Sequence, residues 1–315
     1  MSLETRYFKT IRDIPREDRF APGHRLCAGC GPAIAMKLAM KAVRGPTVVV
    51  NATGCVEVAT SMFPFSAWGV PWVHVAFENA AAVASGIVGA MEILHKKRGK
   101  PTYDVIAIAG DGGTFDIGLQ ALSGALERGH DLLYICYDNE AYMNTGIQRS
   151  GATPLGAATT TSPAGKVIPG KQERKKDLVG IAAAHRIPYA ATASISHPLD
   201  FMNKVRKAIE IDGPTLIHVL APCTLGWRYP SSMTVKIARL AVETRYFPIY
   251  EVENGKVKIN IKVTKPKPLE EFLKPQRRFR HLLKPENKHV LEELKRQVEE
   301  NWERLTKLEE TGVTL

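Results

Sequence analysis

The chain has 315 residues, of which 44% are hydrophobic and 24% are charged, and its formal net charge is +11. This length can hold one large α/β domain with appendages and a buried core. No apolar run approaches the roughly 18–20 residues needed to span a bilayer, and the N-terminus lacks the apolar segment of a signal peptide. We therefore expect a cytoplasmic protein whose five cysteines are reduced, metal-bound or catalytic rather than paired in disulfides.

The positive charge raises the question of nucleic-acid binding. The basic residues are dispersed, however, and the densest cluster, Lys171–Lys176, contains Glu173 and precedes Asp177. The sequence carries no zinc-finger, RRM or KH signature. A basic surface that attracts an acidic protein partner explains the charge better than nucleic-acid binding does.

Taken in chain order, the first predicted elements form an arm and an α/β segment. Residues 1–25 are polar and irregular and predict an extended N-terminal arm. The composition then predicts a helix over Ala33–Val43, a short strand over Thr47–Val50 and a closely packed helix over Glu78–Lys97.

Two short apolar runs, Asp104–Ala109 and Leu132–Tyr137, predict buried strands. The helical pattern of Ile117–Leu126 lies between them, which predicts a β-α-β unit with parallel strands. The same pattern of helices and strands continues over Asp177–His185, Pro188–Ala193, Pro198–Ile211, Thr215–Leu220 and Thr234–Thr244. The expected fold is α/β, with a mostly parallel sheet flanked by helices.

Between these elements, Ser150–Gly170 is rich in Gly, Ala, Ser, Thr and Pro and lacks periodicity. A structureless stretch of this length is usually functional or mobile.

The composition changes after residue 254. Val257–Val263 predicts an edge strand, and Glu286–Glu310 predicts a final helix whose apolar face packs against its own domain or another subunit. We expect an arm (1–25), a main domain (26–254) and a C-terminal extension (255–315).

The segment Gly110-Asp-Gly-Gly-Thr114 stands where a parallel strand ends and a helix begins. Such a turn offers unpaired amides to an anion. Asp111 supplies an oxygen suited to Mg²⁺, Asn139 follows the next strand, and the backbone carbonyl of Ala141 offers a third oxygen. Ordinary turns also use Gly-Asp-Gly, but the spacing to Asn139 favours a metal–diphosphate site. P-loop and dinucleotide motifs are absent from the sequence.

Four of the five cysteines predict a soft-metal centre. Cys27 and Cys30 form a Cys-x-x-Cys pair, and Cys55 and Cys223 each follow a predicted strand. Four thiolates hold either an iron–sulfur cluster or Zn²⁺. The fifth, Cys136, lies inside a predicted strand and is expected to be a small buried hydrophobe.

Three further polar residues deserve interpretation. Glu57 and Glu78 are candidate acid–base groups, although a satisfied or solvated carboxylate explains each of them better. His24 precedes the Cys-x-x-Cys pair and is expected to lie behind the ligands or at the surface rather than to be a ligand.

The run Ala109–Gly118, together with Tyr137–Gln148, closely resembles the thiamine-diphosphate-binding β subunit of 2-oxoacid:ferredoxin oxidoreductases, pyruvate:ferredoxin oxidoreductase in particular. The likeness extends to three further motifs: His24–Gly31, Asn51–Cys55 and Pro222–Arg228. It spans roughly residues 20–280, and motifs of this length are specific.

The resemblance implies a set of ligands for each cofactor. It implies a [4Fe–4S] cluster on Cys27, Cys30, Cys55 and Cys223. It implies Mg²⁺ on Asp111, Asn139 and the Ala141 carbonyl, and contacts to thiamine diphosphate from Gly110, Asp111, Gly112, Gly113, Thr114 and Asn139. Asn144 is expected to face the thiazolium ring and the substrate, and is the candidate catalytic residue.

The activity implied by the resemblance is oxidative decarboxylation of a 2-oxoacid, pyruvate first, with coenzyme A accepting the acyl group and ferredoxin the electrons. The same chemistry on 2-oxoglutarate, a branched-chain or aryl 2-oxoacid, or oxalate remains an alternative. So does a zinc-stabilised nucleotide-binding scaffold subunit.

The resemblance also implies partners. The glutamate that activates thiamine diphosphate belongs to a pyrimidine-binding domain that we do not find in this sequence, so we expect a partner subunit to supply it. A ferredoxin-like subunit and soluble ferredoxin complete the expected partners, and neither nucleic acid nor a membrane is among them.

Overall fold

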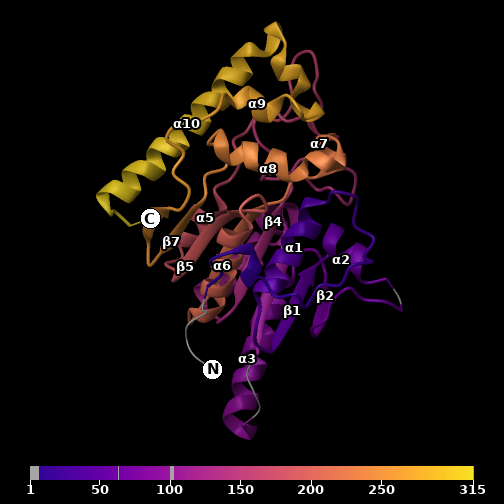
Figure 1. Cartoon of the computed structure of the whole chain (residues 1–315), viewed down its shortest axis with the longest axis vertical. Coiled ribbons are helices and arrows are strands. Elements are labelled where there is room, and N and C mark those ends of the chain that lie inside the picture. Colours follow the sequence, from indigo (N-terminus) through magenta and orange to yellow (C-terminus); the bar gives the residue numbers. More distant parts are fainter. Residues whose placement is uncertain (1–6, 63, 100–102, 315) are drawn as a thin grey trace.

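A computed structural model describes residues 7–62, 64–99 and 103–314 of the chain. Within them, eight strands form one sheet in the order β2-β1-β3-β4-β6-β5-β7-β8. The strands from β2 to β5 in this order run parallel, and β7 and β8 add an antiparallel hairpin at one edge. Helices flank the sheet (Figure 1). The predicted α/β fold with a mostly parallel sheet is confirmed.

The strands lie close to the predicted ranges. They are β1 Thr47–Ala52, β2 Trp72–Val75, β3 Asp104–Gly110, β4 Leu133–Asp138, β5 Tyr189–Ser194, β6 Thr215–Leu220, β7 Tyr250–Glu253 and β8 Lys256–Ile259. Every residue of β1, β4, β5 and β6 is buried, which is why these strands appear as continuous apolar runs in the sequence. The sequence did not predict β2 and β7, because each has only four residues and no apolar run.

The helices are α1 Gly31–Ala42, α2 Cys55–Thr60, α3 Ala80–Arg98, α4 Leu119–Glu127, α5 Leu178–Ala183, α6 Pro198–Glu210, α7 Thr224–Trp227, α8 Thr234–Glu243, α9 Leu269–Leu273 and α10 Lys288–Thr311. A π-helical turn covers Gly112–Asp116, and a 3₁₀ helix covers Arg277–Leu283. The short helices α2, α7 and α9 were not predicted, since four to six residues are too few to display helical periodicity. None of the described helices is both long and apolar enough to cross a membrane.

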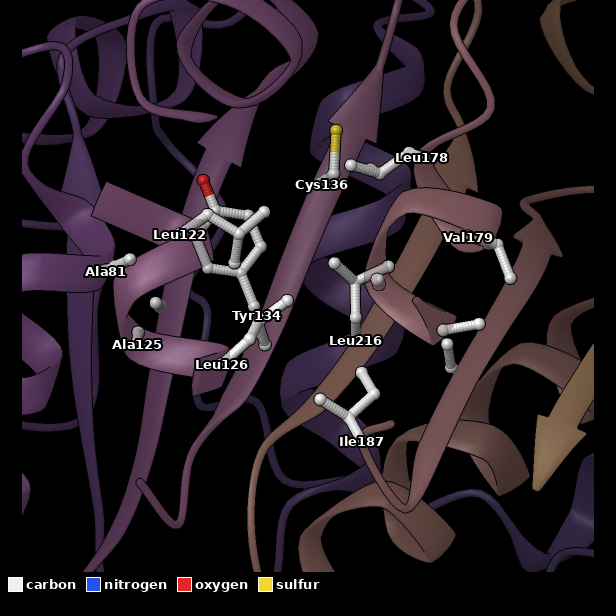
Figure 2. Close-up of a cluster of buried hydrophobic side chains, with 14 of the residues drawn as sticks. Ala81, Leu122, Ala125, Leu126, Tyr134, Cys136, Leu178, Val179, Ile187 and Leu216 are labelled. Carbon is white, nitrogen blue, oxygen red and sulfur yellow. The ribbon is translucent and has the colours of Figure 1, made fainter. Parts of the chain in front are cut away.

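The sheet separates two hydrophobic clusters. Figure 2 shows part of one, to which Leu126 of α4, Val179 of α5 and Leu216 of β6 contribute. Alternate residues of β4 point to the opposite face, where Ile135 packs in a cluster with side chains of α1 and α6. Cys136 is fully buried in the first cluster, so its predicted role as a small hydrophobe is confirmed.

The final helix packs on its own chain. Leu291 and Leu294 of α10 belong to a third buried cluster, while Trp302 and Leu305 join the first. The sequence predicted that this apolar face packs either against its own domain or against another subunit. In the structure it packs against its own chain. In Figure 1, α10 (yellow) runs along one side of the molecule, and α7, α8 and α9 lie at one end of it.

The segment Ser150–Gly170 has no helix or strand, as its composition predicts. Its first part, 150–157, is nevertheless buried throughout. One isolated bridge joins Ala164 to Pro169. The loop is therefore anchored at its start and exposed further along.

Candidate cofactor pocket and metal centre

The Gly-Asp-Gly turn lies where two adjacent parallel strands end. β3 and β4 are paired so that Gly110 lies opposite Tyr137. Asp111 therefore comes close to the residues that follow β4, and the backbone N–H of Asn139 donates to its Oδ1 at 3.3 Å. Beyond Asp111 the chain enters the π-helical turn Gly112–Asp116. The first backbone amides of this turn have no partner within the helix, so they are available to an anion beside Asp111.

The glycines of this turn are required by the close approach of aromatic rings. A Cβ placed at Gly112 would lie 2.3 Å from the Tyr142 ring, and one at Gly113 would lie 3.1 Å from the Phe77 carbonyl oxygen. The rings of Phe77 and Tyr142 contact each other edge to face, with centroids 5.6 Å apart. Any side chain at Gly112 would therefore displace a wall of the site.

The Asp111 carboxyl is 1% exposed and accepts a hydrogen bond from Ser150 Oγ at 2.6 Å. Burial, with a further contribution from the neighbouring Asp138, raises the pKa of Asp111 well above its ordinary value. A carboxylate buried in this way is costly without a compensating cation. The environment therefore fits a bound metal ion better than an isolated acid.

Two further groups converge on this carboxylate. The side-chain amide of Asn139 lies 3.0 Å from Asp111 Oδ1 and 2.8 Å from the carbonyl oxygen of Ala141, and its nitrogen can donate to both oxygens. With a cation between the three groups, the amide would instead turn its oxygen towards the ion. Adjacent ligands of an octahedral Mg²⁺ stand about 2.9 Å apart, given ligand distances of about 2.0–2.1 Å. The donor set thus fits the ion implied by the resemblance.

A cavity of about 90 Å³ opens beside these oxygens. Its lining comprises Thr53, Gly54, Cys55, Phe77, Gly110, Asp111, Gly112, Gly113, Tyr137, Asn139, Ala141, Tyr142, Met143, Asn144 and Thr145. Asn144 is exposed at its rim. Thr114 is absent from the lining, because its hydroxyl donates to the Gly110 carbonyl at 2.8 Å and lies 3.1 Å from Tyr134 Oη. Any contact from Thr114 to the cofactor would come from its backbone.

The four cysteines of the predicted metal centre lie near three helix starts. Cys30 is the N-cap of α1, Cys55 is the first residue of α2, and Cys223 is the N-cap of α7. The backbone N–H of Gly226 donates to Cys223 Sγ at 3.2 Å. Cys27 precedes α1 and is exposed.

The thiols influence one another electrostatically. Burial, with smaller contributions from the other cysteine sulfurs, raises the pKa of Cys30 and of Cys55 to about 12. Burial also raises the pKa of Cys223, and Cys27 adds to the effect. These thiols are therefore protonated at neutral pH unless a metal centre displaces their protons.

Among the described residues, no group of three or more His, Cys, Asp or Glu side chains is close enough to hold one metal ion. Four thiolates around one Zn²⁺ would stand about 3.8 Å apart, given Zn–S distances of about 2.3 Å. An iron–sulfur cluster places several metal ions between its ligands and so needs wider spacing.

Two of the cysteine segments are packed backbone to backbone. The N–H of Gly31 donates to the Pro222 carbonyl at 3.1 Å, and a Cβ at Gly31 would lie 2.5 Å from that oxygen. Gly29 has φ +68°, and a Cβ there would lie 2.3 Å from the Ser231 carbonyl oxygen. Glycine at these positions lets the Cys27–Cys30 turn approach Cys223.

A buried ionic network connects the cofactor turn to the cysteine centre. Glu140 is fully buried with φ +64°, and it accepts hydrogen bonds from Arg278 Nη2 at 2.6 Å and from Tyr246 Oη at 2.8 Å. The Arg278 guanidinium lies 3.7 Å from the centroid of the Trp227 ring. The indole N–H of Trp227 donates to the Asn139 carbonyl at 2.7 Å.

Lys175 completes this network. Its Nζ lies 2.8 Å from the Glu140 carboxylate and also donates to the Asp138 carboxylate. Nε2 of His218 lies 2.7 Å from the same Asp138 carboxylate. Arg278 thus links a metal-ligand segment to the helix that follows Cys223. The sequence analysis missed Arg278, since it lies in no motif and is 138 positions from Glu140.

The remaining candidates lie outside the cavity. Glu57 is buried, and its Oε1 lies 3.2 Å from Nδ1 of His74 and accepts from Ser61 Oγ at 3.3 Å. Neither it nor Glu78 belongs to the lining, which favours the reading of satisfied carboxylates. Nδ1 of His24 is buried without a hydrogen-bond partner among the described residues, and its ring lies 5.2 Å from that of Phe20.

Comparison with known proteins adds a family assignment to this geometry. Residues 52–219 match the model of the thiamine pyrophosphate enzyme, C-terminal TPP-binding domain. Pyruvate synthase subunit PorB of Methanocaldococcus jannaschii is 61% identical over 275 residues, covering 86% of this chain and 92% of that protein. The PorB of Thermotoga maritima is 53% identical, covering 94% of this chain and 93% of that protein.

Two further similarities bear on substrate and fold. Ketoisovalerate oxidoreductase subunit VorB of Pyrococcus abyssi is 51% identical and covers 94% of this chain and 95% of that protein. The solved 2-oxoglutarate:ferredoxin oxidoreductase from Magnetococcus marinus matches with a TM-score of 0.54 and 18% identity, over 74% of this chain and 82% of that one. At that identity the match concerns the fold alone.

Proposed function

The chain belongs to the β subunits of 2-oxoacid:ferredoxin oxidoreductases, and from this premise we propose that it binds thiamine diphosphate with Mg²⁺ and a [4Fe–4S] cluster. The complex that it helps to form oxidatively decarboxylates a 2-oxoacid. Ferredoxin takes the electrons and coenzyme A takes the acyl group.

One observation carries the proposal. Cys55, one of the four candidate cluster ligands, lines the same cavity as Asp111 and Asn139, the candidate Mg²⁺ ligands. A cofactor in this cavity and a cluster on the cysteines would lie side by side. Electrons released at the cofactor would then have a short path to the metal centre.

The residues of this chain have distinct tasks in the proposed reaction. The Gly110–Gly113 turn offers backbone amides to the diphosphate, and Asp111, Asn139 and the Ala141 carbonyl hold Mg²⁺. When bound, thiamine diphosphate supplies the electron sink for loss of CO₂ from the 2-oxoacid. Asn144, exposed at the cavity rim, would orient a substrate carbonyl or carboxylate by hydrogen bonding.

The cysteine centre would be shielded on most sides. Cys30, Cys55 and Cys223 are partly buried and Cys27 is exposed, so a cluster bound to them would be open to solvent or a partner near Cys27. Burial and hydrogen bonds to sulfur, such as that from Gly226, tune the reduction potential of such a cluster.

This chain supplies only part of the cofactor site. Its cavity of about 90 Å³ is small beside the roughly 300–1,000 Å³ of typical cofactor pockets. Its lining contains no glutamate that could activate the aminopyrimidine. A partner subunit carrying the pyrimidine-binding half would supply both the second wall and that carboxylate.

Pyruvate is the proposed substrate, because the relatives at 61% and 53% identity are named pyruvate synthase subunits. The ketoisovalerate relative is 51% identical, so branched-chain, aryl, 2-oxoglutarate and oxalate specificities belong in the same assay. Turnover of each acid by the assembled complex, purified without oxygen together with its partner subunits, decides among them.

The zinc-stabilised scaffold remains the alternative of another class. The anaerobically purified chain should be brown, absorb broadly near roughly 400 nm and contain about four iron atoms, as expected of a [4Fe–4S] protein. A colourless chain with stoichiometric zinc and no affinity for thiamine diphosphate would overturn the proposed function.

A further inference from the structure

One buried side chain, that of Tyr137, contacts both the cofactor turn and the loop that carries Cys55. Tyr137 lies near the end of β4 and is 1% exposed. It pairs with Gly110 in the sheet, and a Cβ on Gly110 would lie 3.1 Å from its ring. A Cβ on Gly54 would lie 2.7 Å from its hydroxyl oxygen. The phenol therefore reaches from the residue before Asp111 to the residue before Cys55.

The hydroxyl of Tyr137 lies at the start of α2. The N-cap residue of this helix is Gly54, which has no side chain to accept from the first helical amides. The backbone N–H of Val56 donates to the Tyr137 hydroxyl instead. Tyr137 thus supplies, from a distant strand, an acceptor that the start of α2 lacks. This contact fixes the first turn of α2, which contains Cys55.

The same hydroxyl keeps a proton that it can donate. A phenol has one O–H donor besides its acceptor lone pairs, and no carbonyl or side chain among the described residues accepts the Tyr137 proton. Burial, and then the negative charge of the Cys55 sulfur, raise the pKa of Tyr137 well above its ordinary value. The phenol therefore stays protonated beside a potential thiolate acceptor.

The sulfur of Cys55 differs from its neighbours in its donors. The backbone N–H of Ala33 donates to the sulfur of Cys30, and that of Gly226 donates to the sulfur of Cys223. In the described part of the chain, no backbone amide donates to the sulfur of Cys55. Cys55 and Tyr137 line the same cofactor cavity. The donor that Cys55 lacks and the acceptor that Tyr137 lacks are therefore neighbours.

We propose that Tyr137 is a positioning residue whose hydroxyl donates a hydrogen bond to the sulfur of Cys55 when that sulfur is a cluster ligand, and so raises the reduction potential of the cluster. Because it requires a cluster on Cys55, this bond rests on the proposed function. Hydrogen bonds to ligand sulfur stabilise the reduced cluster, which carries one more negative charge than the oxidised cluster. The proton stays on Tyr137, and no covalent bond changes.

The test uses the full chain purified without oxygen, in which no cluster of a partner subunit overlaps the signal. Tyr137→Phe removes the hydroxyl and keeps the ring. The matched control is Tyr134→Phe, because Tyr134 belongs to the same strand and is equally buried. Its hydroxyl lies 3.1 Å from Thr114 Oγ1, and its ring packs in the cluster of Figure 2, on the opposite face of the sheet from Tyr137. The cluster is titrated with a reductant and followed by EPR.

The hydroxyl should favour the reduced cluster. At a fixed potential near the midpoint, the ratio of reduced to oxidised cluster should fall at least about threefold in Tyr137→Phe, with unchanged iron content. The control should keep this ratio within about 1.5-fold of the unaltered chain. An unchanged or higher ratio in Tyr137→Phe, or an equal fall in Tyr134→Phe, overturns the inference.

A ring-fluorinated tyrosine at position 137 provides a test in the opposite direction. It keeps the hydroxyl and nearly the same volume, but its more acidic phenol is a stronger donor, so the ratio of reduced to oxidised cluster should rise. If Tyr137→Phe loses its iron or fails to fold, this variant decides alone: a rise supports the inference, and an unchanged ratio overturns it. An unaltered chain that holds no iron, alone or in the complex, is instead a failure of the proposed function.

Discussion

At the scale of single residues, the cofactor cavity is distinguished by buried carboxyl groups that do not all have a cationic partner. Asp111 and Glu140 are both buried carboxyls near the cofactor cavity, but they differ in their partners. Glu140 is paired with Arg278 and Lys175. The Asp111 carboxyl instead accepts hydrogen bonds from two neutral groups, the Ser150 hydroxyl and the Asn139 backbone N–H. Asp111 therefore lacks the direct cationic contact that Glu140 has.

Asp111→Asn should separate stability from binding. The neutral amide avoids the cost of burying a charge, so the melting temperature of the cofactor-free chain should be unchanged or higher. Mg²⁺-dependent affinity for thiamine diphosphate should fall at least about 100-fold, as measured by calorimetry.

The same substitution at Asp116 provides the contrast. Burial acts to raise the pKa of Asp116, but hydrogen bonds from Lys176 and the Gly151 amide outweigh it and lower the pKa. Asp116→Asn should therefore lower the melting temperature. Tight cofactor retention by the Asp111 variant would contradict the assignment of the metal site.

Arg278→Met should disrupt the link between the two centres. It leaves Glu140 buried without its guanidinium partner, which typically costs about 3–5 kcal/mol of unfolding free energy in urea titrations. The adjacent Arg277 is exposed and unpaired among the described residues, so Arg277→Met should change that free energy by less than about 0.5 kcal/mol.

The effect of Arg278→Met should also reach both cofactors, because Asn139 and Trp227 depend on the same contacts. Mg²⁺–cofactor affinity and the EPR spectrum of the reduced cluster should both change. If the variant is destabilised but keeps its Mg²⁺–cofactor affinity and its EPR spectrum, Arg278 has only a structural role.

At the scale of elements, the cysteine centre depends on how closely two chain segments approach. The start of α1 and the segment before α7 touch through Gly31 and Pro222. Both elements begin just past a cysteine, so their separation sets the spacing between Cys30 and Cys223. Small displacements of the backbone here therefore translate directly into ligand geometry.

Gly31→Ala should weaken the metal centre by forcing these segments apart, since the new Cβ would lie 2.5 Å from backbone atoms of Ala221 and Pro222. We expect less iron per chain, weaker absorbance near roughly 400 nm, and a stability loss of about 1–3 kcal/mol.

Gly86→Ala in α3 is the matched control, because its Cβ would meet nothing within 4 Å. It should leave the iron content unchanged and gain up to about 1 kcal/mol from helix propensity. Full iron content in the Gly31 variant would show that the approach of the two segments is not needed for ligation.

At the scale of the whole molecule, the chain presents two open surfaces on either side of the segment that contains Thr145 and Ile147: the cofactor cavity and a cleft lined by Arg228, Arg277 and Arg280. We propose that a second subunit closes over the first of these surfaces. The net charge of +11 adds a long-range attraction for acidic proteins.

The isolated chain should therefore be inactive, and its affinity for thiamine diphosphate should be at least about 10-fold weaker than that of the complex with the partner that carries the pyrimidine-binding half. Titration of the cofactor into the chain alone and into the complex measures the difference. Decarboxylation by the isolated chain at the rate of the complex would contradict the shared site.

The sequence by itself determined the longer buried strands, the parallel β-α-β unit and the position of the Gly-Asp-Gly turn. These depend on local patterns: continuous apolar runs mark buried strands, and glycines mark the turn where β3 ends. Residue type and spacing singled out the four cysteines and Asp111, and the resemblance then implied a [4Fe–4S] cluster and Mg²⁺ as what they bind. Short elements such as β2 and α7 were missed because four residues carry no period.

Only the tertiary structure decided how these parts act together. It paired Glu140 with Arg278 across 138 positions, turned the Thr114 hydroxyl away from the cavity, and gathered Arg228 and Arg277 around one cleft. Each of these results depends on packing between distant segments. No local pattern encodes such packing, because the contacts exist only once the sheet and its C-terminal cover have assembled.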